Sequence, residues 1–593
     1  MTDAATDAEP EGPGGPDDPG AGGTTLAEGS PVTDRPVFAF AAALTLAFVA
    51  WGVIARESLS NTAAALLDWT MRNLGWAFVI AASGFVVFAL WLAVSRYGKI
   101  TLGRDGEKPE FRTSSWIAMM FSAGMGIGLM FYGASEPLTH FAKPPPGTVP
   151  RQSPEAIETA LATTLFHWTV HPWAIYAVVG LAIGYSTFRK GRRQLISSAF
   201  TPLLGKRTSN GPIGRFIDVL AIFATLFGSA ASLGLGTLQI RSGLHELGWV
   251  ENLSNPLLVL IIAVLTAAFV VSAVSGVARG IQYLSNINMV LAAVLAVFVF
   301  VVGPTVLILD LLPTAIGGYF RDLAEMSART AATGGDAMYT WLSGWTVFYW
   351  AWWISWTPFV GMFIARISRG RTIRQFVAGV ILVPSVVSLI WFAVFGGAAI
   401  FIQDGGTNIW GNADTPEEVH LFNTLGELPL AAIASLVVVV LVAIFFVSGA
   451  DAASIVMGTL SQRGAVEPRR WVVIFWGAVM GAVATIMLLV GKESALEGLK
   501  NITILVAVPF TLVMAVLCVS LAKDLRQDPL MIREEKGAEV VEQAVSYGKR
   551  RFGEEFLLQV FSPRRHAGRG RPEVDGDGDG DVSAHAGSHR KEE

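Results

Sequence analysis

The sequence predicts an all-α protein that crosses a membrane twelve times. Three features carry this prediction: a shortage of charge, a series of long apolar runs, and the placement of Arg and Lys between those runs. Of the 593 residues, 52% are hydrophobic and only 15% are charged, whereas a soluble protein has about 25% charged residues. A chain this poor in charge must place much of its surface against something other than water. The net charge of −4 gives no reason to expect nucleic acid as a partner.

The apolar runs are long enough to be membrane spans, because about 20 apolar residues in helix cross a bilayer core of roughly 30 Å. Lipid offers no hydrogen bonds, so each span must satisfy its own backbone as a helix. The third and tenth runs are predicted to be interrupted. The twelve runs are about 36–55, 74–95, 114–134, 160–188, 213–237, 255–275, 286–312, 343–365, 373–402, 429–459, 471–491 and 501–522.

The connections between the runs predict the orientation. Those that follow even-numbered runs are rich in Arg and Lys, for example in 96–112, 189–193, 366–374 and 463–470, whereas the connection 403–428 has neither residue. By the positive-inside rule both termini are expected in the cytoplasm, with the protein in the plasma (inner) membrane. The N-terminus does not have the pattern of a secretory signal.

Two tails flank the predicted twelve-helix domain, which covers 36–525. Residues 1–35 are acidic and rich in Pro and Gly, and we expect a disordered cytoplasmic tail. The cytoplasmic C-terminal tail, 526–593, contains a charged stretch at 534–560 that can form a helix, and it is a candidate regulatory element. Segment 325–342 is predicted to be an amphipathic helix on the outer face. The single cysteine, Cys518, excludes a disulfide framework.

The third span contains three glycines two residues apart, at positions 124, 126 and 128. Each glycine weakens a helix by about 1 kcal/mol relative to alanine. Packing of small residues between helices is the plainer explanation. Glycines with this spacing face different sides of a helix, however, which favours local unwinding.

The eighth span is unusually rich in tryptophan. At about 100° per residue, six of its aromatic residues fall within a stripe about 80° wide, and Trp353 flanks that stripe. Tryptophan usually marks the membrane interface, but several of these indoles lie in mid-span and must pack against helices or line a cavity. Pro358 could open the helix near the stripe. The six residues of the stripe are Trp345, Tyr349, Trp352, Trp356, Phe359 and Phe363.

The fourth span adds Trp168, Trp173 and Tyr176 to the aromatic set, all within about 140° of one face of a continuous helix. A cation held over several indole faces gains about 0.5–2 kcal/mol per ring. A methylated ammonium group cannot donate hydrogen bonds, so an aromatic cage suits it. The residues alone leave such a cage and ordinary aromatic packing as equal alternatives.

Hydroxyl groups in two spans are candidate ion ligands. Thr225 and Ser229 lie one turn apart in the fifth span, and Ser448 lies where the tenth span is expected to be interrupted. Sodium prefers oxygen ligands, although an isolated Ser or Thr in a membrane helix usually bonds its own backbone. Asp451 is an acid within a span, which is costly and usually functional or paired. His167 and His171, expected on one helix with no acidic partner, do not suggest an enzyme.

These segments resemble the betaine–choline–carnitine transporter family over roughly residues 36–525. The motifs that carry the resemblance are AGMGIGLMFYGASEPLTHF (123–141), HWTVHPWAIYA (167–177), WTVFYWAWWISWTPFVGMFIARISRGRT (345–372) and FFVSGADAAS (445–454). The resemblance implies twelve helices, of which the last ten form two inverted five-helix repeats of the LeuT type, with two extra helices before them. Substrate would lie between the third and eighth spans near mid-membrane. It also implies a homotrimer.

The resemblance implies roles for particular residues. An aromatic box for substrate would use the indoles and the phenol of the fourth and eighth spans, with a second set of residues nearby or along the pathway. These substrate residues are Trp168, Trp173, Tyr176 and Trp353, then Trp356, Met125, Gly128, Trp352 and Phe363. One sodium ion would bind Thr225, Ser229 and Phe359, and another would bind Ser122, Met125, Phe445 and Ser448.

Two positions bear on coupling and on substrate. Sodium-coupled members of the family have two adjacent hydroxyl residues where this chain has Ser448 and Gly449, so one ligand of the second sodium site is lost. Choline carriers tend to have Asp where this chain has Gly128, which favours a zwitterion that brings its own carboxylate.

The resulting hypothesis is a secondary transporter that imports glycine betaine or a similar compatible solute with sodium, under osmotic stress. The alternatives are a carrier of choline, carnitine or ectoine that is coupled to protons or works by exchange only. An osmosensing channel is a further alternative, but the spans contain too few polar residues for an open pore. No cofactor is expected. The basic part of the C-terminal tail could bind anionic lipid.

Overall fold

The computed structural model describes residues 32–124, 126–275, 278–491 and 494–553, and the chain in these ranges is helical throughout, with one isolated bridge between Thr101 and Thr372. Short helices η1 (Arg96–Lys99), η2 (Tyr185–Arg189), η3 (Ser197–Phe200) and η4 (Glu417–Val419) lie in the connections. The longer helices are α1 (Arg35–Ile54), α2 (Arg56–Val94), α3 (Thr113–Gly124), α4 (Ile127–Ala142), α5 (Pro154–Trp168), α6 (Val170–Gly184), α7 (Thr201–Ser209), α8 (Pro212–Glu246), α9 (Asn255–Ser275), α10 (Ala278–Val302), α11 (Thr305–Ala328), α12 (Ala331–Gly344), α13 (Thr346–Ile367), α14 (Ile373–Asp404), α15 (His420–Gly426), α16 (Ala431–Ser461), α17 (Arg470–Val490), α18 (Ala495–Arg526) and α19 (Pro529–Phe552).

Each predicted apolar run is helical, which confirms an all-α polytopic membrane protein. Among the described residues, eight helices are individually long and apolar enough to cross a membrane, and α10 with α11 forms a ninth candidate bent by 108°. The predicted third, fourth and eighth spans are not in this set, because the first two are each divided into two short helices. The fourth and eighth spans are also the ones that contribute the predicted aromatic residues.

The third span is broken where its glycines predict a break. Helix α3 ends at Gly124, α4 begins at Ile127, and Gly126 between them is fully extended with φ −170° and ψ −178°. The structure therefore favours unwinding over simple small-residue packing at this point. Met125 lies outside the described residues.

Two expectations about helix breaks were wrong. The fourth span was expected to be one helix, but it divides at Thr169, whose φ of −115° and ψ of −106° are not helical. The tenth span was expected to be interrupted at 448–451, yet α16 runs unbroken from Ala431 to Ser461. A Gly beside a Ser is too weak a signal for a break when apolar residues flank it on both sides. Helix α13 likewise continues past Pro358.

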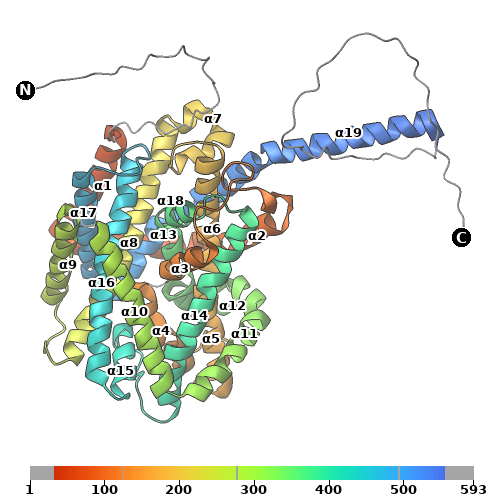
Figure 1. Cartoon of the computed structure of the whole chain (residues 1–593). Coiled ribbons are helices and arrows are strands. Elements are labelled where there is room, and N and C mark those ends of the chain that lie inside the picture. The colour runs from red at the N-terminus through yellow and green to blue at the C-terminus, as the bar shows by residue number, and fades with distance from the viewer. Residues whose placement is uncertain (1–31, 125, 276–277, 492–493, 554–593) are drawn as a thin grey trace, which may run out of the picture. The chain divides into compact units, whose positions relative to one another are not determined.

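Helix α13 lies at the centre of the bundle, against α6, α8 and α18 (Figure 1). Glycines allow this close approach. A Cβ atom at Gly361 of α13 would lie 2.8 Å from Val179 of α6, and one at Gly228 of α8 would lie 2.9 Å from the Cβ of Ser355. Small residues at helix contacts are typical of membrane bundles, in which close packing replaces the hydrophobic effect between helices.

The helix contacts are related by a shift of five spans. Helix α13 of the eighth span packs on α6 of the fourth, and α4 of the third span packs on α14 of the ninth. Helices α8 and α16, from the fifth and tenth spans, pack against each other. Two five-span repeats predict this exchange of partners. Inversion of the repeats remains a prediction from the family resemblance.

The segments outside the spans are described only in part. Residues 1–31, for which disorder was expected, and 554–593 lie outside the described ranges. The chain divides into two compact units, one up to Asp528 and the other from Pro529, and the charged helix expected at 534–560 corresponds to α19 in the second unit. The amphipathic segment 325–342 is divided between the end of α11 and α12.

A substitution at Gly228 tests the close contact between α8 and α13. Gly228→Val should lower the stability of the folded protein by about 1–3 kcal/mol, because the added side chain meets the Ser355 backbone in a packed interface. Gly449→Val is the matched control, since a Cβ atom there meets nothing within 4 Å. Thermal unfolding of both purified variants in detergent measures the effect, and equal midpoints would contradict this account of the packing.

Candidate substrate pocket

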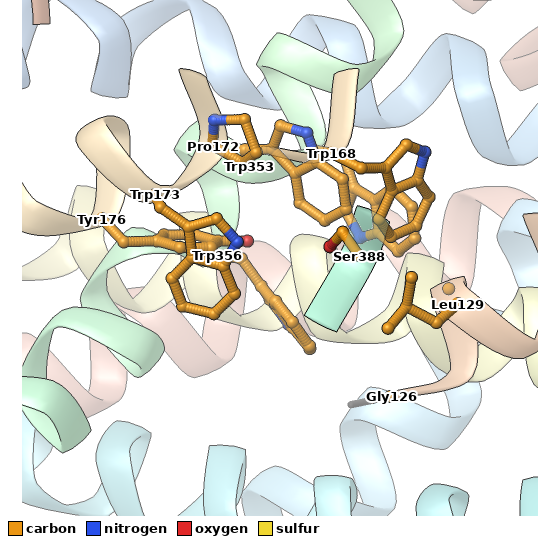
Figure 2. Close-up of a pocket in the computed structure, with 11 residues that line it drawn as sticks. Gly126, Leu129, Trp168, Pro172, Trp173, Tyr176, Trp353, Trp356 and Ser388 are labelled. Atoms are coloured by element: carbon orange, nitrogen blue, oxygen red, sulfur yellow. The ribbon is translucent and has the colours of Figure 1, made fainter. Parts of the chain in front are cut away.

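An aromatic pocket lies where the broken third span meets the fourth, eighth and ninth spans (Figure 2). Its accessible volume is about 40 Å³, which is room for a few water molecules. None of the described lining residues carries a formal charge. The lining consists of Gly126, Gly128, Leu129, Trp168, Pro172, Trp173, Tyr176, Trp352, Trp353, Trp356 and Ser388.

One wall of the pocket consists of three indoles. Trp352 and Trp353 are stacked with ring centroids 4.5 Å apart, and Trp168 meets Trp353 edge to face at 4.9 Å. Each indole N–H of this wall is bonded to the protein. Their acceptors are Glu136 Oε2 for Trp168, Ser232 Oγ for Trp352 and the His167 carbonyl for Trp353, at 2.7, 3.2 and 3.0 Å. These bonds hold the three ring faces in place, so we name this set the anchored wall.

The break at Thr169 creates one of these acceptors. Helix α5 ends at Trp168, so the carbonyls of its last turn lack the usual partners within the helix. The Trp353 indole donates to the His167 carbonyl at 3.0 Å. The break therefore ties the fourth span to the eighth at the edge of the pocket.

The opposite side of the pocket contains Trp173, Tyr176 and Trp356 (Figure 2). The Tyr176 hydroxyl and the Trp356 Nε1 atom are both buried and have no hydrogen-bond partner. A buried polar group without a partner costs free energy, about 1–3 kcal/mol. Two such donors beside one pocket are therefore available to an acceptor on a ligand.

Gly128 lies against the anchored wall. A Cβ atom there would be 2.8 Å from the Cη2 atoms of both Trp168 and Trp352, so any larger residue must displace these rings. The sequence suggested that Gly128 affects the choice of substrate, because choline carriers tend to have Asp at this position. The structure adds a steric reason, since only glycine leaves both rings where they are.

The structure brings most of the predicted substrate residues together. Trp168, Trp173, Tyr176, Trp352, Trp353, Trp356 and Gly128 all line the pocket. Phe363 does not line it and is 38% exposed near the end of α13, so its role along the pathway remains a prediction. The structure says nothing about Met125.

Two residues of the first proposed sodium site, Thr225 and Ser229, have buried hydroxyl groups on α8. The Ser229 hydroxyl is buried without a partner, and the Thr225 hydroxyl donates to its own helix at the Ala221 carbonyl, which leaves its oxygen able to accept an ion. Ser229 follows Gly228, where α8 touches α13. The Phe359 ring meets Trp356 edge to face at 5.4 Å.

The second proposed sodium site fits less well. The Ser448 hydroxyl donates to the Ile444 carbonyl at 2.8 Å and lies 3.4 Å from the Phe445 carbonyl. Because α16 is unbroken, the Phe445 carbonyl is not freed from its helix as this site requires. Ser122 is half-buried at the end of α3. A sodium ion at these residues therefore remains a prediction, and the continuous α16 helix argues against it.

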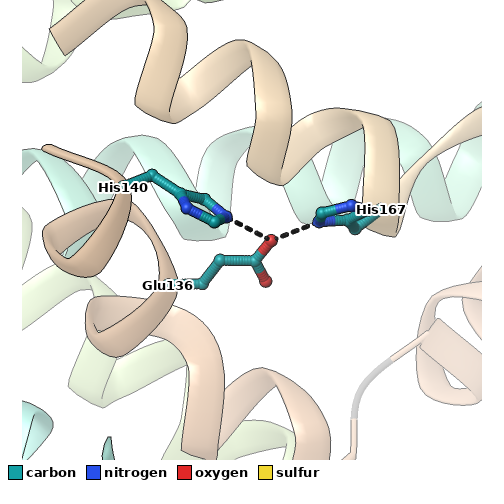
Figure 3. Close-up of side chains that lie close together, drawn as sticks. All are labelled: Glu136, His140 and His167. Carbon is teal, nitrogen blue, oxygen red and sulfur yellow. Dashed lines mark hydrogen bonds and ion pairs between the residues drawn. The ribbon is translucent and has the colours of Figure 1, made fainter. Parts of the chain in front are cut away.

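A buried acid that the sequence argument missed, Glu136, accepts a hydrogen bond from the Trp168 indole and lies between two histidines (Figure 3). Glu136 Oε1 is 2.6 Å from His167 Nδ1 and 3.5 Å from His140 Nε2, and all three side chains are fully buried. The expectation that His167 has no acidic partner was wrong, because α4 brings Glu136 to it from 31 residues away. His167 and His171 also lie on two helices, α5 and α6. An acid so close to the end of an apolar run was the available signal.

Glu418, in η4 outside the spans, is a second buried acid. It pairs with Arg241 at 3.0 Å and does not line the pocket. Burial raises the pKa of the Glu418 carboxyl group, although the Arg241 charge opposes this shift. Burial also lowers the pKa of His420, at the start of α15, to about 4.

The fold and the pocket define a polytopic membrane protein with an aromatic pocket in its core, and none of the described residues that line the pocket carries a formal charge. The family model described as betaine/carnitine/choline family transporter matches residues 36–530. The chain belongs to this family, whose members are transporters and not enzymes.

Several relatives are similar over most of their length. The betaine/ectoine transporter LcoP of Corynebacterium glutamicum is 44% identical, over 89% of this chain and 83% of its own. The glycine betaine transporter OpuD of Bacillus subtilis is 45% identical, over 86% and 97%. The glycine betaine transporter 1 of Vibrio parahaemolyticus is 40% identical, over 83% and 94%.

A substitution at Gly128 tests the role of the anchored wall. Gly128→Ala should weaken binding of a methylated ammonium compound about 5- to 150-fold, which corresponds to about 1–3 kcal/mol for forcing rings apart in a packed site. Quenching of tryptophan fluorescence by the ligand measures this. Gly317→Ala is the control, because a Cβ atom there meets nothing within 4 Å. Unchanged affinity in Gly128→Ala would contradict the steric argument.

Proposed function

We propose that the protein imports a zwitterionic quaternary ammonium compatible solute, with glycine betaine as the leading candidate, across the plasma membrane into the cytoplasm. One observation carries the proposal. The pocket offers three anchored ring faces and two buried, unpartnered donors, with no formal charge among its described lining residues. A molecule with one methylated cation and one carboxylate, and no net charge, complements that set.

The cationic end would lie against the anchored wall. A trimethylammonium group has no N–H to donate and is attracted by the negative face of an aromatic ring, which is strongest for Trp. The three indole N–H groups of this wall are already bonded within the protein, so their faces remain for the ligand. The pocket is narrower than such a group, and the two sides must therefore separate when the ligand enters.

The carboxylate end would accept hydrogen bonds from the Tyr176 hydroxyl and Trp356 Nε1. Both donors become satisfied when the carboxylate of the ligand enters the pocket. A bare cation such as choline would leave them unpaired and would find no counter-charge in the lining. This difference favours a zwitterion, in agreement with the glycine at position 128.

Names of the relatives support the same class of solute. Two of the three relatives described above are named glycine betaine transporters, and the third is named a betaine/ectoine transporter. Ectoine is therefore the second candidate substrate. It also carries a delocalised cation and a carboxylate, so the same two sides of the pocket could hold it.

Sodium is the proposed coupling ion. The support is the unpartnered Ser229 hydroxyl near the contact of α8 with α13, because an ion bound there would be sensitive to the position of α13. One sodium ion at Thr225, Ser229 and Phe359 is favoured over two, given Gly449 and the continuous α16. Proton coupling and exchange-only transport are the alternatives.

The wider physiological role is part of the proposal. We expect both termini in the cytoplasm, a homotrimer as in the family, and uptake that rises with osmotic stress. The basic residues at the end of α19, Lys549, Arg550 and Arg551, could bind anionic lipid at about 1 kcal/mol per residue near the surface. Deletion of 534–593 should then abolish activation by osmolality, and unchanged activation would contradict this role of the tail.

Uptake into liposomes tests substrate and coupling together. Labelled glycine betaine, ectoine, carnitine and choline are offered to the reconstituted protein with and without an inward sodium gradient. Glycine betaine or ectoine should accumulate only with the gradient. Accumulation that is unchanged in potassium buffer would exclude sodium coupling, and transport of choline alone would exclude a zwitterionic substrate.

Removal of single donors tests how the carboxylate is held. Tyr176→Phe and Trp356→Phe should each weaken binding of glycine betaine about tenfold, the value of one hydrogen bond to a charged group. Choline binding should change less than threefold in the same variants, whereas Trp353→Leu removes a ring face and should weaken both ligands. Equal losses for betaine and choline in the two Phe variants would contradict the proposed orientation. Isothermal titration of purified protein provides these affinities.

A further inference from the structure

The Glu136 carboxylate is surrounded by donors from three helices. Oε2 accepts hydrogen bonds from Trp168 Nε1 at 2.7 Å and from the Tyr349 hydroxyl. Oε1 faces the two imidazoles of His167 and His140 (Figure 3). The acid lies on α4, and its partners lie on α4, α5 and α13, so one side chain joins the third, fourth and eighth spans.

The imidazole of His167 extends this network. Its Nδ1 atom faces Glu136, and its Nε2 atom lies 2.9 Å from Thr346 Oγ1 at the start of α13. Its backbone carbonyl accepts a hydrogen bond from the indole N–H of Trp353. Through its side chain or its backbone, His167 is therefore bonded to both Glu136 and Trp353, and two indoles of the anchored wall depend on this one cluster.

Tyr349, which is bonded to Glu136, also packs against all three rings of the anchored wall. Its ring lies 5.8 Å from Trp353 and 6.3 Å from Trp352, stacked on both, and 5.5 Å from Trp168. A buried carboxylate that loses a donor is costly, because a charge in the protein interior needs its hydrogen bonds. The cluster therefore resists movement of Trp168 and Tyr349, and with them of the whole anchored wall.

We propose that Glu136 is a positioning residue of the substrate pocket. Its Oε2 atom accepts hydrogen bonds from both Trp168 and Tyr349, and these bonds fix the anchored wall against which the cation of the ligand is held. This inference rests on the proposed function for its ligand. Glu136 does not line the pocket and acts on the solute only through the rings of the anchored wall. Among the described residues, the Tyr176 hydroxyl and the Trp356 indole N–H on the opposite side have no hydrogen-bond partner that would fix them in the same way.

Three variants of the full-length protein test the proposal by affinity. Glu136→Ala should raise the KM and the Kd for glycine betaine at least tenfold and change the maximal rate less than threefold, since the rings are displaced and the transport steps are retained. Glu136→Gln keeps an oxygen that accepts from Trp168 and Tyr349, and should bind within threefold of the wild-type Kd. Trp168→Phe keeps a ring and loses the anchoring N–H, and should weaken binding at least tenfold.

Glu418→Ala is the matched control for removal of a buried acid. It breaks the ion pair with Arg241 away from the pocket, and should lower the unfolding temperature of the ligand-free protein while the Kd changes less than threefold. A merely structural role for Glu136 predicts this same pattern for Glu136→Ala.

Folded Glu136→Ala with wild-type affinity would overturn the proposal. Affinity in Glu136→Gln as low as in Glu136→Ala would also overturn the proposal, because it would show that binding depends on the negative charge of Glu136 and not on its hydrogen bonds. If Glu136→Ala does not fold, wild-type affinity in Trp168→Phe overturns it.

A second measurement does not depend on the ligand. Fluorine NMR of the fluorotryptophan-labelled protein gives a resonance for Trp168, assigned by its loss in Trp168→Phe. Without any solute, that resonance should shift or broaden in Glu136→Ala and stay in place in Glu136→Gln and Glu418→Ala. An unchanged resonance in Glu136→Ala would overturn the positioning role. If the wild type binds no osmolyte of the panel, the proposed function fails, and this spectrum still decides whether Glu136 fixes Trp168.

Discussion

A polar group in the spans can form hydrogen bonds only with the protein or with what its pockets hold, and this constraint shapes the aromatic pocket. Lipid cannot satisfy a backbone carbonyl or an indole N–H, so broken helices persist only where neighbouring side chains supply the missing bonds. The Trp353 indole bonds the His167 carbonyl at the end of α5, and the Trp391 indole bonds the Leu129 carbonyl near the start of α4. Of these two indoles, Trp353 also lines the aromatic pocket.

The same constraint explains why the two sides of the pocket differ. On one side the N–H groups of Trp168, Trp352 and Trp353 are all used within the protein, which fixes the rings. On the other side Tyr176 and Trp356 keep donors without partners, at a cost in free energy. A protein that only needed a packed core would gain by satisfying them. Their unsatisfied state is consistent with a ligand that brings an acceptor, and with a side that is free to move.

Close packing of α13 makes the pocket responsive to the rest of the bundle. Glycines at positions 228 and 361 bring its backbone into contact with α8 and α6. Ser229 follows Gly228 in α8, so it lies beside the contact of α8 with the helix that carries Trp352, Trp353 and Trp356. This contact is a physical route by which an ion on α8 and a solute on α13 could be coupled.

The sequence by itself determined the helical membrane fold, the broken third span and the aromatic set, because apolar length, glycine spacing and residue type are local properties. It could not show that Thr169 divides the fourth span or that α16 continues through Gly449, since local signals for breaks are weak and neighbouring helices decide between them. Only the tertiary structure showed which indoles are anchored and which donors are free, because their partners lie on other helices. Glu136 and His167 are 31 residues apart in the sequence and meet for the same reason. The packing of α4 against α5 brings them together, and the periodicity of either helix alone does not predict this contact.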